Sequence, residues 1–504
     1  MRLAELAIGI TMSCATASAM SSSREASRNE SSANISASSV TTSVQTSAKP
    51  NIILMMADDL GYGDTGFNGN QIIKTPSLDL MAKQGVKMTN FHAGGPVCSP
   101  TRGTYLTGRH YFRYGIYTAN VGHLPKQEIT IAEILKQQGY NTGHFGKWHL
   151  GTLSEKVSAK GVKRKPKENY SPPSWHGYDT SFVTESAVAT WDPAKGERAY
   201  NNPFYLDGVP VNPRDPSLQG GASKVVMDRA LAHIKKSVSQ NKPFFTVIWF
   251  HAPHKPVIAG PEYLKMYQDH GEAAHYYGAI TEMDDQIGRL RETLTTLGVS
   301  DNTLITFTSD NGPEGKRQNP ANAGSTMGLK GRKRSLFEGG VRVPSLALWP
   351  EHIKAGSVIT EPTSTLDYLP TITQLFDYQM PDNRPIDGTS LLPLLLKQSE
   401  ELVTEKQFSR AKPIPFRTKK VFAMIDGNYK LVLKRKTKQL QLFDIEKDPK
   451  ELTDIAKNNP EIVNRLYQEF LGFNQSAKQS QRGRDYGDDS FKPVGKWLGL
   501  KITK

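Results

Sequence analysis

The chain has 504 residues, of which 37% are hydrophobic and 22% are charged, so it is long and apolar enough to bury a large core. Its formal net charge of +14 indicates an acidic partner: nucleic acid, an anionic surface or a polyanionic substrate. Zinc-finger, P-loop and RNA-recognition signatures are absent, as is any run of about 20 apolar residues, so we expect no nucleic-acid partner and no membrane span.

The N-terminal segment predicts an exported protein. Residues 1–19 have the features of a secretory signal peptide: an early arginine, a short apolar stretch and a small-residue cleavage site at Ala17-Ser18-Ala19. Residues 20–48 are mostly Ser, Ala, Thr and Asn, which predicts a disordered linker. We therefore expect a periplasmic or secreted protein. Lipid attachment at Cys14 is the alternative to removal of the whole segment.

The next part of the chain alternates apolar runs with helical patterns. Four runs predict buried strands, at residues 51–57, 244–250, 303–308 and 345–349. Three segments predict helices, at residues 77–84, 130–138 and 273–297. This alternation predicts an α/β catalytic domain over residues 49–394, with a mainly parallel sheet flanked by helices. Ligands of such sheets bind at the carboxyl ends of strands, so the polar clusters that follow the runs should converge on one site.

The pattern changes after about residue 395. Residues 421–425, 429–433 and 439–443 predict short antiparallel strands, the first two joined by a hairpin turn at Asp426-Gly427-Asn428. A helix is predicted at residues 461–471. We expect a smaller α+β subdomain over residues 395–504.

Two acidic pairs follow two of the predicted strands. Asp58 and Asp59 end the first run, and Asp310 and Asn311 follow the third. Several oxygen ligands suit a hard divalent cation, and the absence of a zinc-type spacing favours calcium or magnesium. The alternative is that each pair caps the turn after its strand.

Once the N-terminal segment is removed, Cys98 is the single thiol, so no internal disulfide can form. It stands in Pro96-Val97-Cys98-Ser99-Pro100-Thr101-Arg102, where a loop is expected to enter a helix. The amides at a helix start should lower the pKa of its thiol. A lone cysteine is otherwise a small buried apolar residue, but the Cys-x-Pro-x-Arg spacing favours a chemical role.

Basic and imidazole side chains follow other strands. Lys147 and His149 alternate along an expected extended segment and can face one ligand. An ammonium group neutralises an anion and an imidazole can transfer a proton, although a solvated lysine and a structural histidine are the default for this pair alone. His254 follows the central strand in Pro253-His254-Lys255-Pro256, after a neighbouring His251.

Taken together, these motifs resemble the type I, formylglycine-dependent sulfatases, especially bacterial polysaccharide sulfatases of the arylsulfatase type. The Cys98 motif resembles their first signature, and residues 139–149 resemble their second; the similarity covers about residues 50–350. Tyr429-Lys430-Leu431 resembles part of the family's C-terminal domain. The resemblance implies an alkaline-phosphatase-like fold and sulfuric ester hydrolase activity. It also implies a maturation enzyme that oxidises Cys98 to formylglycine (3-oxoalanine).

The resemblance further implies one calcium ion, with magnesium the less favoured ion. Lys147 and Lys333 would bind the sulfate oxygens; Lys333 is chosen over Lys330 because it lies five residues before Glu338, the family's offset. A solvated basic loop is the alternative for both. The implied ligands of the ion are Asp58, Asp59, Asp310, Asn311 and the oxidised Cys98.

The same resemblance implies roles in the reaction. Arg102 orients the aldehyde hydrate, and Asp310 is the base for the attacking hydroxyl. His254 or Lys333 protonates the departing sugar oxygen. His149 helps to take the second proton when sulfate is expelled.

The substrate is the feature that the sequence determines least. The basic stretches 160–167 and 410–420 suit a polyanionic chain, although each can also be a solvated surface. Residues 177–193, which include Trp191, lie where the family varies its substrate loops, and they resemble sulfatases of marine galactans such as carrageenan.

Two other functions stay open. Relatives of this fold that hydrolyse phosphonates or phosphodiesters use the same cysteine maturation. A catalytically dead polyanion-binding protein is the second alternative. Lys147 and Lys333 favour sulfate over phosphate, and the intact Cys98 motif argues against a dead enzyme.

Overall fold

The computed structural model describes residues 49–315, 323–396, 408, 410–434, 437, 439–488 and 490–493, all of which belong to one compact unit. The predicted signal segment 1–19, the linker 20–48 and Cys14 lie outside the described residues. The domain boundary at residue 394 stays a prediction.

A ten-stranded sheet carries the fold. Its strands are β1 (Asn51–Ala57), β2 (Val86–Met88), β4 (Asn141–Lys147), β5 (Thr180–Thr184), β6 (Tyr205–Leu206), β7 (Val209–Pro210), β8 (Phe244–Trp249), β9 (Thr303–Ser309), β10 (Leu346–Leu348) and β11 (Ser357–Ile359). Their order is β11-β2-β10-β9-β1-β8-β4-β5-β6-β7. β9, β1, β8, β4 and β5 run parallel, whereas β10 is antiparallel to β9 and β2. The expectation of a mainly parallel sheet is confirmed, and the predicted strand at 345–349 is the exception in direction.

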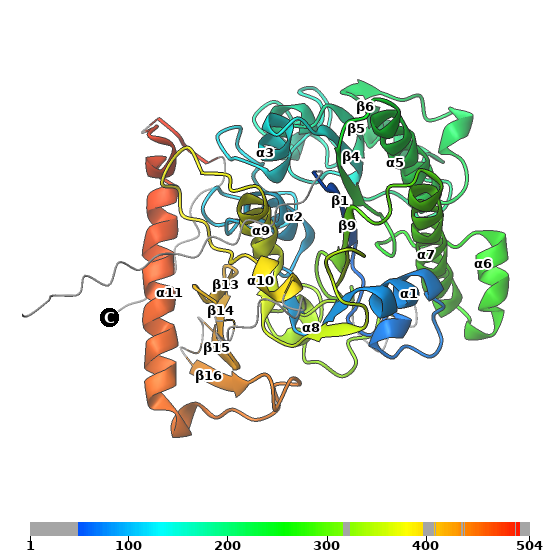
Figure 1. Cartoon of the computed structure of the whole chain (residues 1–504). Coiled ribbons are helices and arrows are strands. Elements are labelled where there is room, and N and C mark those ends of the chain that lie inside the picture. The colour runs from blue at the N-terminus through cyan, green and yellow to red at the C-terminus, as the bar shows by residue number, and fades with distance from the viewer. Residues whose placement is uncertain are drawn as a thin grey trace, which may run out of the picture. The chain divides into compact units, whose positions relative to one another are not determined.

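Helices cover both faces of this sheet (Figure 1). The helices of the α/β part are α1 (Pro76–Gln84), α2 (Cys98–Thr107), α3 (Ile131–Gln137), α4 (Arg198–Asn201), α5 (Ala222–Ser239), α6 (Pro261–Met266), α7 (Ala273–Thr296), α8 (Glu338–Val341), α9 (Tyr368–Leu375) and α10 (Leu392–Leu395). The three predicted helices correspond to α1, α3 and α7; α5 and α9 were not predicted. Within the described ranges, no helix combines the length and the apolar character needed to cross a bilayer.

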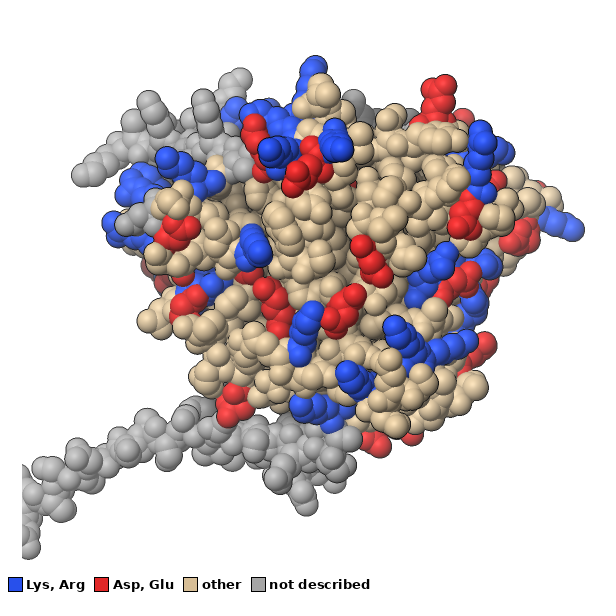
Figure 2. Space-filling model, turned by 90° about the horizontal axis from the view of Figure 1, so that it is seen from above, with Lys and Arg blue, Asp and Glu red and all other residues tan. Residues whose placement is uncertain are grey.

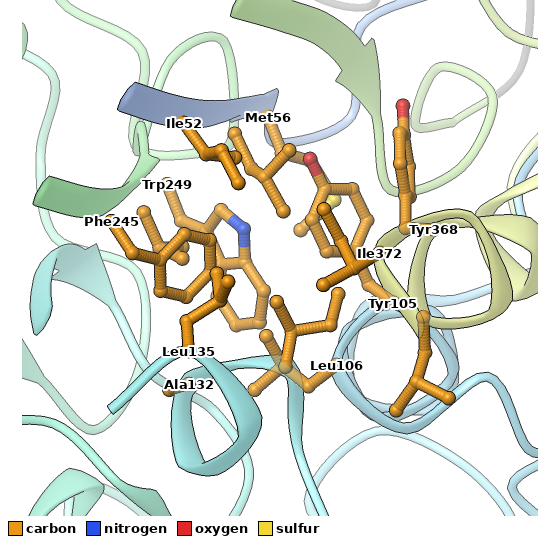
Figure 3. Packing of buried hydrophobic residues seen from close by; sticks show 14 of the residues in the cluster. Ile52, Met56, Tyr105, Leu106, Ala132, Leu135, Phe245, Trp249, Tyr368 and Ile372 are labelled. Carbon is orange, nitrogen blue, oxygen red and sulfur yellow. The ribbon is translucent and has the colours of Figure 1, made fainter. Parts of the chain in front are cut away.

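The alternation of side chains along β1 divides the core in two. Ile52 and Met56 face the core that contains α2, α3 and α9, whereas Ile53 and Met55 face the core that contains α1, α5 and α7. Figure 3 shows the first core, where Ile52 and Met56 lie above side chains of these helices, with Trp249 of β8 beside them. Because both faces are covered, all seven β1 residues are buried, which explains the uninterrupted apolar run.

A second, antiparallel sheet follows near the C-terminus. It consists of β13 (Ile414–Arg417), β14 (Val421–Asp426), β15 (Tyr429–Lys434) and β16 (Gln439–Asp444), in that order, and is followed by α11 (Pro460–Ser480). The hairpin between β14 and β15 is confirmed, β13 was not predicted, and the helix is longer than expected. One face of this sheet packs against α11, and the other contacts Leu336, Val341 and Leu366 of the α/β part. A two-stranded pair of β3 (Phe91–His92) and β12 (Thr363–Ser364) lies apart from both sheets.

Candidate active site

Four polar side chains meet where β1 and β9 end. The two strands are parallel neighbours, so Asp58 and Asp59 leave the sheet at the same edge as Asp310 and Asn311. The backbone N–H of Asp59 donates to Oδ1 of Asp310 (3.1 Å), and Nδ2 of Asn311 donates to Oδ1 of Asp59 (2.7 Å). All four are buried. Asp59 adopts a left-handed φ of 68°, a strained conformation for a residue other than glycine that these contacts hold in place.

Cys98 is the first residue of α2, and its thiol donates to this acidic group. Its Sγ lies 3.3 Å from Oδ1 of Asp58, and 1% of the residue is exposed. Burial raises the pKa of the Cys98 thiol far above its ordinary value, and the Asp310 and Asp58 carboxylates raise it further. The predicted lowering of this pKa is therefore wrong, because lost hydration and two carboxylates outweigh the amides at the helix start. The unmodified thiol stays protonated at neutral pH and is a poor nucleophile.

Arg102 lies one helical turn after Cys98 and reaches the same carboxylates. Its guanidinium donates to Oδ2 of Asp310 (2.7 Å) and to the backbone oxygen of Lys147 (3.1 Å). The guanidinium carbon stands 4.9 Å from the centroid of the Trp249 ring. The side chain is fully buried, so these partners hold it in one position.

Two lysines complete the charged group. Lys147, at the end of β4, places Nζ 2.6 Å from Oδ2 of Asp58, and Lys333 places Nζ 2.6 Å from Oδ1 of Asp59. Lys330, the alternative to Lys333, instead donates to the backbone oxygen of Glu451 at 3.0 Å. The structure thus brings Lys147 and Lys333 to the acidic pair from two chain-distant segments and keeps Lys330 away.

Three histidines lie around the acidic residues and the lysines, and they differ in burial. β4 ends at Lys147, and His149 has a left-handed φ of 59°, so the expected extended alternation does not continue to His149. Burial lowers the pKa of His149 well below its ordinary value, and Lys147 and Arg102 lower it further, so the ring is neutral. His254 places Nε2 3.7 Å from Oδ2 of Asp59, and its side chain is 24% exposed. His251 is fully buried beside them.

The acidic residues also have the chemistry of a cation site. Candidate ligand atoms of Asp58, Asp59, Cys98 and His254 lie within 4.8 Å of one another. Oδ1 of Asn311 is buried and finds no hydrogen-bond partner in the described part of the chain, which leaves an oxygen lone pair for a ligand. Oxygen donors that outnumber the softer ones fit a hard divalent ion. His254 was not predicted among the candidate ligands.

Three further residues beside the site were missed in the sequence. Asn120 accepts a hydrogen bond from Nε2 of His149 (2.9 Å). Glu314 lies 3.5 Å from Nζ of Lys333 and pairs with Arg334. Glu314 could have been found from the sequence, because it lies only three residues after the Asp310-Asn311 pair. Asn120 could not, because its loop is distant in sequence from β4 and no local pattern links it to His149.

Comparison with known proteins places these residues in a family context. A family model described as "Sulfatase" matches residues 50–378, and one described as "N-sulphoglucosamine sulphohydrolase, C-terminal" matches residues 331–476. The chain is 35% identical to N-acetylgalactosamine-6-sulfatase of Homo sapiens over 69% of this chain, and it spans 66% of that relative's length. It is 36% identical to arylsulfatase A of Bos taurus over 76% of this chain and 75% of the relative.

Among solved structures, the chain is similar to the crystal structure of Ps i-CgsB in complex with k-i-k-neocarrahexaose. The TM-score is 0.73 and the identity 29%, and the match covers 88% of this chain and 98% of that chain.

Proposed function

The chain belongs to the sulfatase family, and from this membership we propose that it is a sulfuric ester hydrolase acting on sulfate groups of a sulfated carbohydrate. One observation carries the proposal: buried Cys98 donates to Asp58 within a group whose Arg102, Lys147 and Lys333 supply fixed positive charge. A sulfate ester gains negative charge on its oxygens as it is attacked, and preorganised cations stabilise that charge.

We propose that a maturation enzyme oxidises Cys98 to formylglycine. In its hydrated form, this residue supplies a hydroxyl nucleophile for the sulfur atom. The raised pKa of the thiol supports the need for such a change, since an unmodified Cys98 is protonated. The reach of Arg102 into the same carboxylates supports its role in orienting the modified side chain.

A calcium ion, rather than magnesium, is the proposed cofactor, and it would supply positive charge to the sulfate oxygens. Oδ1 of Asn311, which has no hydrogen-bond partner among the residues that the structure describes, supports an oxygen-rich site, and the position of His254 adds a candidate nitrogen donor. The proposed ligands are Asp58, Asp59, Asp310, Asn311 and the modified residue 98.

The remaining residues bind sulfate and move protons. We assign Lys147 and Lys333 to the sulfate oxygens. Each ammonium group now contacts a carboxylate, of Asp58 or of Asp59, and can exchange that contact for one with a sulfate oxygen. Asp310 is the base that takes the proton of the attacking hydroxyl. His254, the more exposed of the two candidates, or Lys333 donates a proton to the departing sugar oxygen.

His149 is the proposed acceptor of the second proton, and its contacts support this role. Its Nε2 faces Oδ1 of Asn120, which can only accept, so the ring proton sits on Nε2. Nδ1 is buried and without a hydrogen-bond partner among the described residues. A neutral ring with an available Nδ1 lone pair is the form that can take a proton, and because burial and Lys147 lower its pKa, it would pass that proton on rather than keep it.

For the substrate, we propose a polyanionic algal galactan such as carrageenan, met in the periplasm or outside the cell. The similarity to Ps i-CgsB, which was crystallised in complex with k-i-k-neocarrahexaose, and the net charge of +14 support this choice. On the face in Figure 2, basic and acidic side chains are interspersed across neutral surface, so long-range attraction there is weaker than the net charge suggests.

Sulfate release from defined substrates tests the proposal. Protein produced with a maturation enzyme is assayed on matched aryl sulfate and aryl phosphate esters and on a panel of sulfated oligosaccharides of known linkage. We expect faster cleavage of the sulfate ester and release from galactan oligosaccharides. Faster phosphate cleavage would favour the phosphodiester or phosphonate alternative. An unmodified Cys98 peptide in the mass spectrum of protein from its native host would favour a non-catalytic binder.

A further inference from the structure

Arg334 and Glu314 form an ion pair next to the sulfate-binding lysine of the proposed site. The guanidinium nitrogens of Arg334 lie 2.6 and 2.9 Å from the two carboxylate oxygens of Glu314. Glu314 also lies 3.5 Å from Nζ of Lys333. The backbone N–H of Arg334 donates to the oxygen of Pro96 (2.8 Å), two residues before Cys98. The pair therefore contacts both the segment that carries Cys98 and the side chain of Lys333.

The backbone at Arg334 is held in a conformation that its side chain disfavours. Its φ is 77°, in the left-handed region where glycine is the least strained residue. Long side chains in this region cost free energy, and they concentrate at functional sites. An exposed ion pair adds little to stability and does not offset that cost. Stability therefore does not explain why an arginine, rather than a glycine, occupies position 334.

Exposure increases along this group from the interior to the surface. The side chain of Lys333 is 4% exposed, that of Glu314 is 26% exposed and that of Arg334 is 63% exposed. The hydrogen bond with Glu314 raises the pKa of the Arg334 guanidinium, and the more distant Asp59 carboxylate adds to this rise. The pair therefore stands on the solvent side of Lys333, within electrostatic range of Asp59.

The chemistry of the pair selects its ligand. A guanidinium has five N–H donors in a fixed plane, of which Glu314 occupies only part, and the carboxylate retains acceptor lone pairs. Together they present donors and acceptors side by side with no net charge. This suits neighbouring hydroxyl groups, which both donate and accept, better than a second sulfate group.

We propose that Arg334 and Glu314 bind hydroxyl groups of the sugar ring that carries the sulfate ester, and so select a carbohydrate over an aryl sulfate. The inference rests on the proposed function and adds to it a recognition element outside the sulfate-binding residues. Glu314 has a second task, because it also contacts Lys333, so Arg334 is the residue to change.

The test compares two substrates on three variants. Arg334→Gly removes the side chain and relieves the left-handed strain, Arg334→Lys keeps the charge without the planar fork, and Arg465→Ala removes a matched exposed ion pair, that with Asp426, away from the site. Each protein is assayed on a monosulfated galactose and on 4-nitrophenyl sulfate, which has no sugar hydroxyls.

We expect Arg334→Gly to lower kcat/KM for the monosulfated galactose roughly tenfold to a hundredfold, the value of one or two charge-assisted hydrogen bonds, mainly through KM. The loss on the aryl sulfate should be several times smaller, Arg334→Lys should recover part of the difference, and Arg465→Ala should match the wild type. Equal losses on both substrates, or no loss on the sugar, would overturn the proposal.

A wild-type protein that is inactive on both substrates would count against the proposed function instead. In that case, calorimetric titration of monosulfated galactose into the wild type and Arg334→Gly tests the pair alone. We expect weaker binding to the variant, and an unchanged Kd would overturn the inference.

Discussion

Two buried groups of charged residues in this protein invite comparison. The site cluster consists of Asp58, Asp59, Arg102, Lys147, Asp310 and Lys333. The junction cluster, where the C-terminal sheet meets α8, consists of His92, Glu338, Arg342, Lys430 and Glu451. In both, each carboxylate has a cation close by, so charge pairing alone does not distinguish a reactive centre from a structural one.

The two clusters differ in how fully their polar atoms are paired. Near the site cluster, Nδ1 of His149, Oδ1 of Asn311 and Nε of Arg102 are buried without hydrogen-bond partners among the described residues. In the junction cluster, Nζ of Lys430 lies 2.7 Å from Glu338 and 3.1 Å from Glu451, and His92 lies 3.1 Å from Glu338. Such atoms also occur elsewhere in the described core, and Oε1 of Glu451 in the junction cluster is one of them, but it has Nζ of Lys430 3.1 Å away. Oδ1 of Asn311 stands beside the carboxylates of the site cluster, where a bound cation would supply the missing partner.

The largest expected effect comes from the thiol within the site cluster. Cys98→Ala and Cys98→Ser should each lower kcat by several orders of magnitude, because alanine has no group to oxidise and serine lacks the thiol on which the proposed maturation enzyme acts. The measurement is sulfate release, with the melting temperature as the control for folding. Wild-type turnover by Cys98→Ala would refute the assignment of Cys98.

Removal of the divalent ion should affect the same cluster next. Chelation should abolish turnover and lower stability, since an ion at 100 times its Kd stabilises a folded protein by about 2.7 kcal/mol. Activity and melting temperature are followed during dialysis against a chelator and after addition of calcium or magnesium. Full activity in metal-free protein would remove the cation from the proposal.

The junction cluster should respond in stability rather than chemistry. Lys430→Met leaves Glu338 and Glu451 as buried carboxylates without their shared cation, and should cost about 3–5 kcal/mol in the free energy of unfolding. Urea unfolding measures this change. Arg465→Ala, which breaks an exposed pair, is the control and should cost about 1 kcal/mol or less. Similar losses in both variants would show that the junction cluster is not structural.

The smallest effect concerns a buried histidine away from both clusters. Burial lowers the pKa of His233 to about 4, below its ordinary value of 6.5. As the pH falls, His233 is therefore protonated in the unfolded chain before it is protonated in the folded protein. Its contribution to stability is complete above pH 6.5 and is lost as the pH falls toward 4.

His233→Phe should make the fall in unfolding free energy between pH 7 and pH 5 smaller by about 1–2 kcal/mol. Unfolding at the two pH values in the variant and the wild type measures the difference. An unchanged pH dependence would show that His233 does not titrate on unfolding.

Local sequence determined the parts of this protein that depend on neighbouring residues. The uninterrupted apolar run at residues 51–57 became β1 with the same bounds, because a strand buried on both faces needs apolar side chains at every position. The acids after β1 and β9 were identified as a candidate cation site because parallel strands end at one edge. The Cys98 motif indicated the family through its resemblance to the first sulfatase signature, and the family model that matches residues 50–378 confirms that membership.

Only the tertiary structure decided features that depend on contacts between distant segments. The pKa of Cys98 rises because folding buries the thiol beside Asp58 and Asp310, a loss of hydration that no local pattern reports. The sequence chose Lys333 over Lys330 through a family offset, but the contacts themselves come from the fold: Nζ of Lys333 reaches Asp59, whereas Nζ of Lys330 reaches the backbone oxygen of Glu451. Asn120 meets His149, and Arg334 meets Glu314, only across loops that the sheet brings together. Electrostatic and hydrogen-bond energies depend on distance in space, so such contacts are settled by the fold and not by order along the chain.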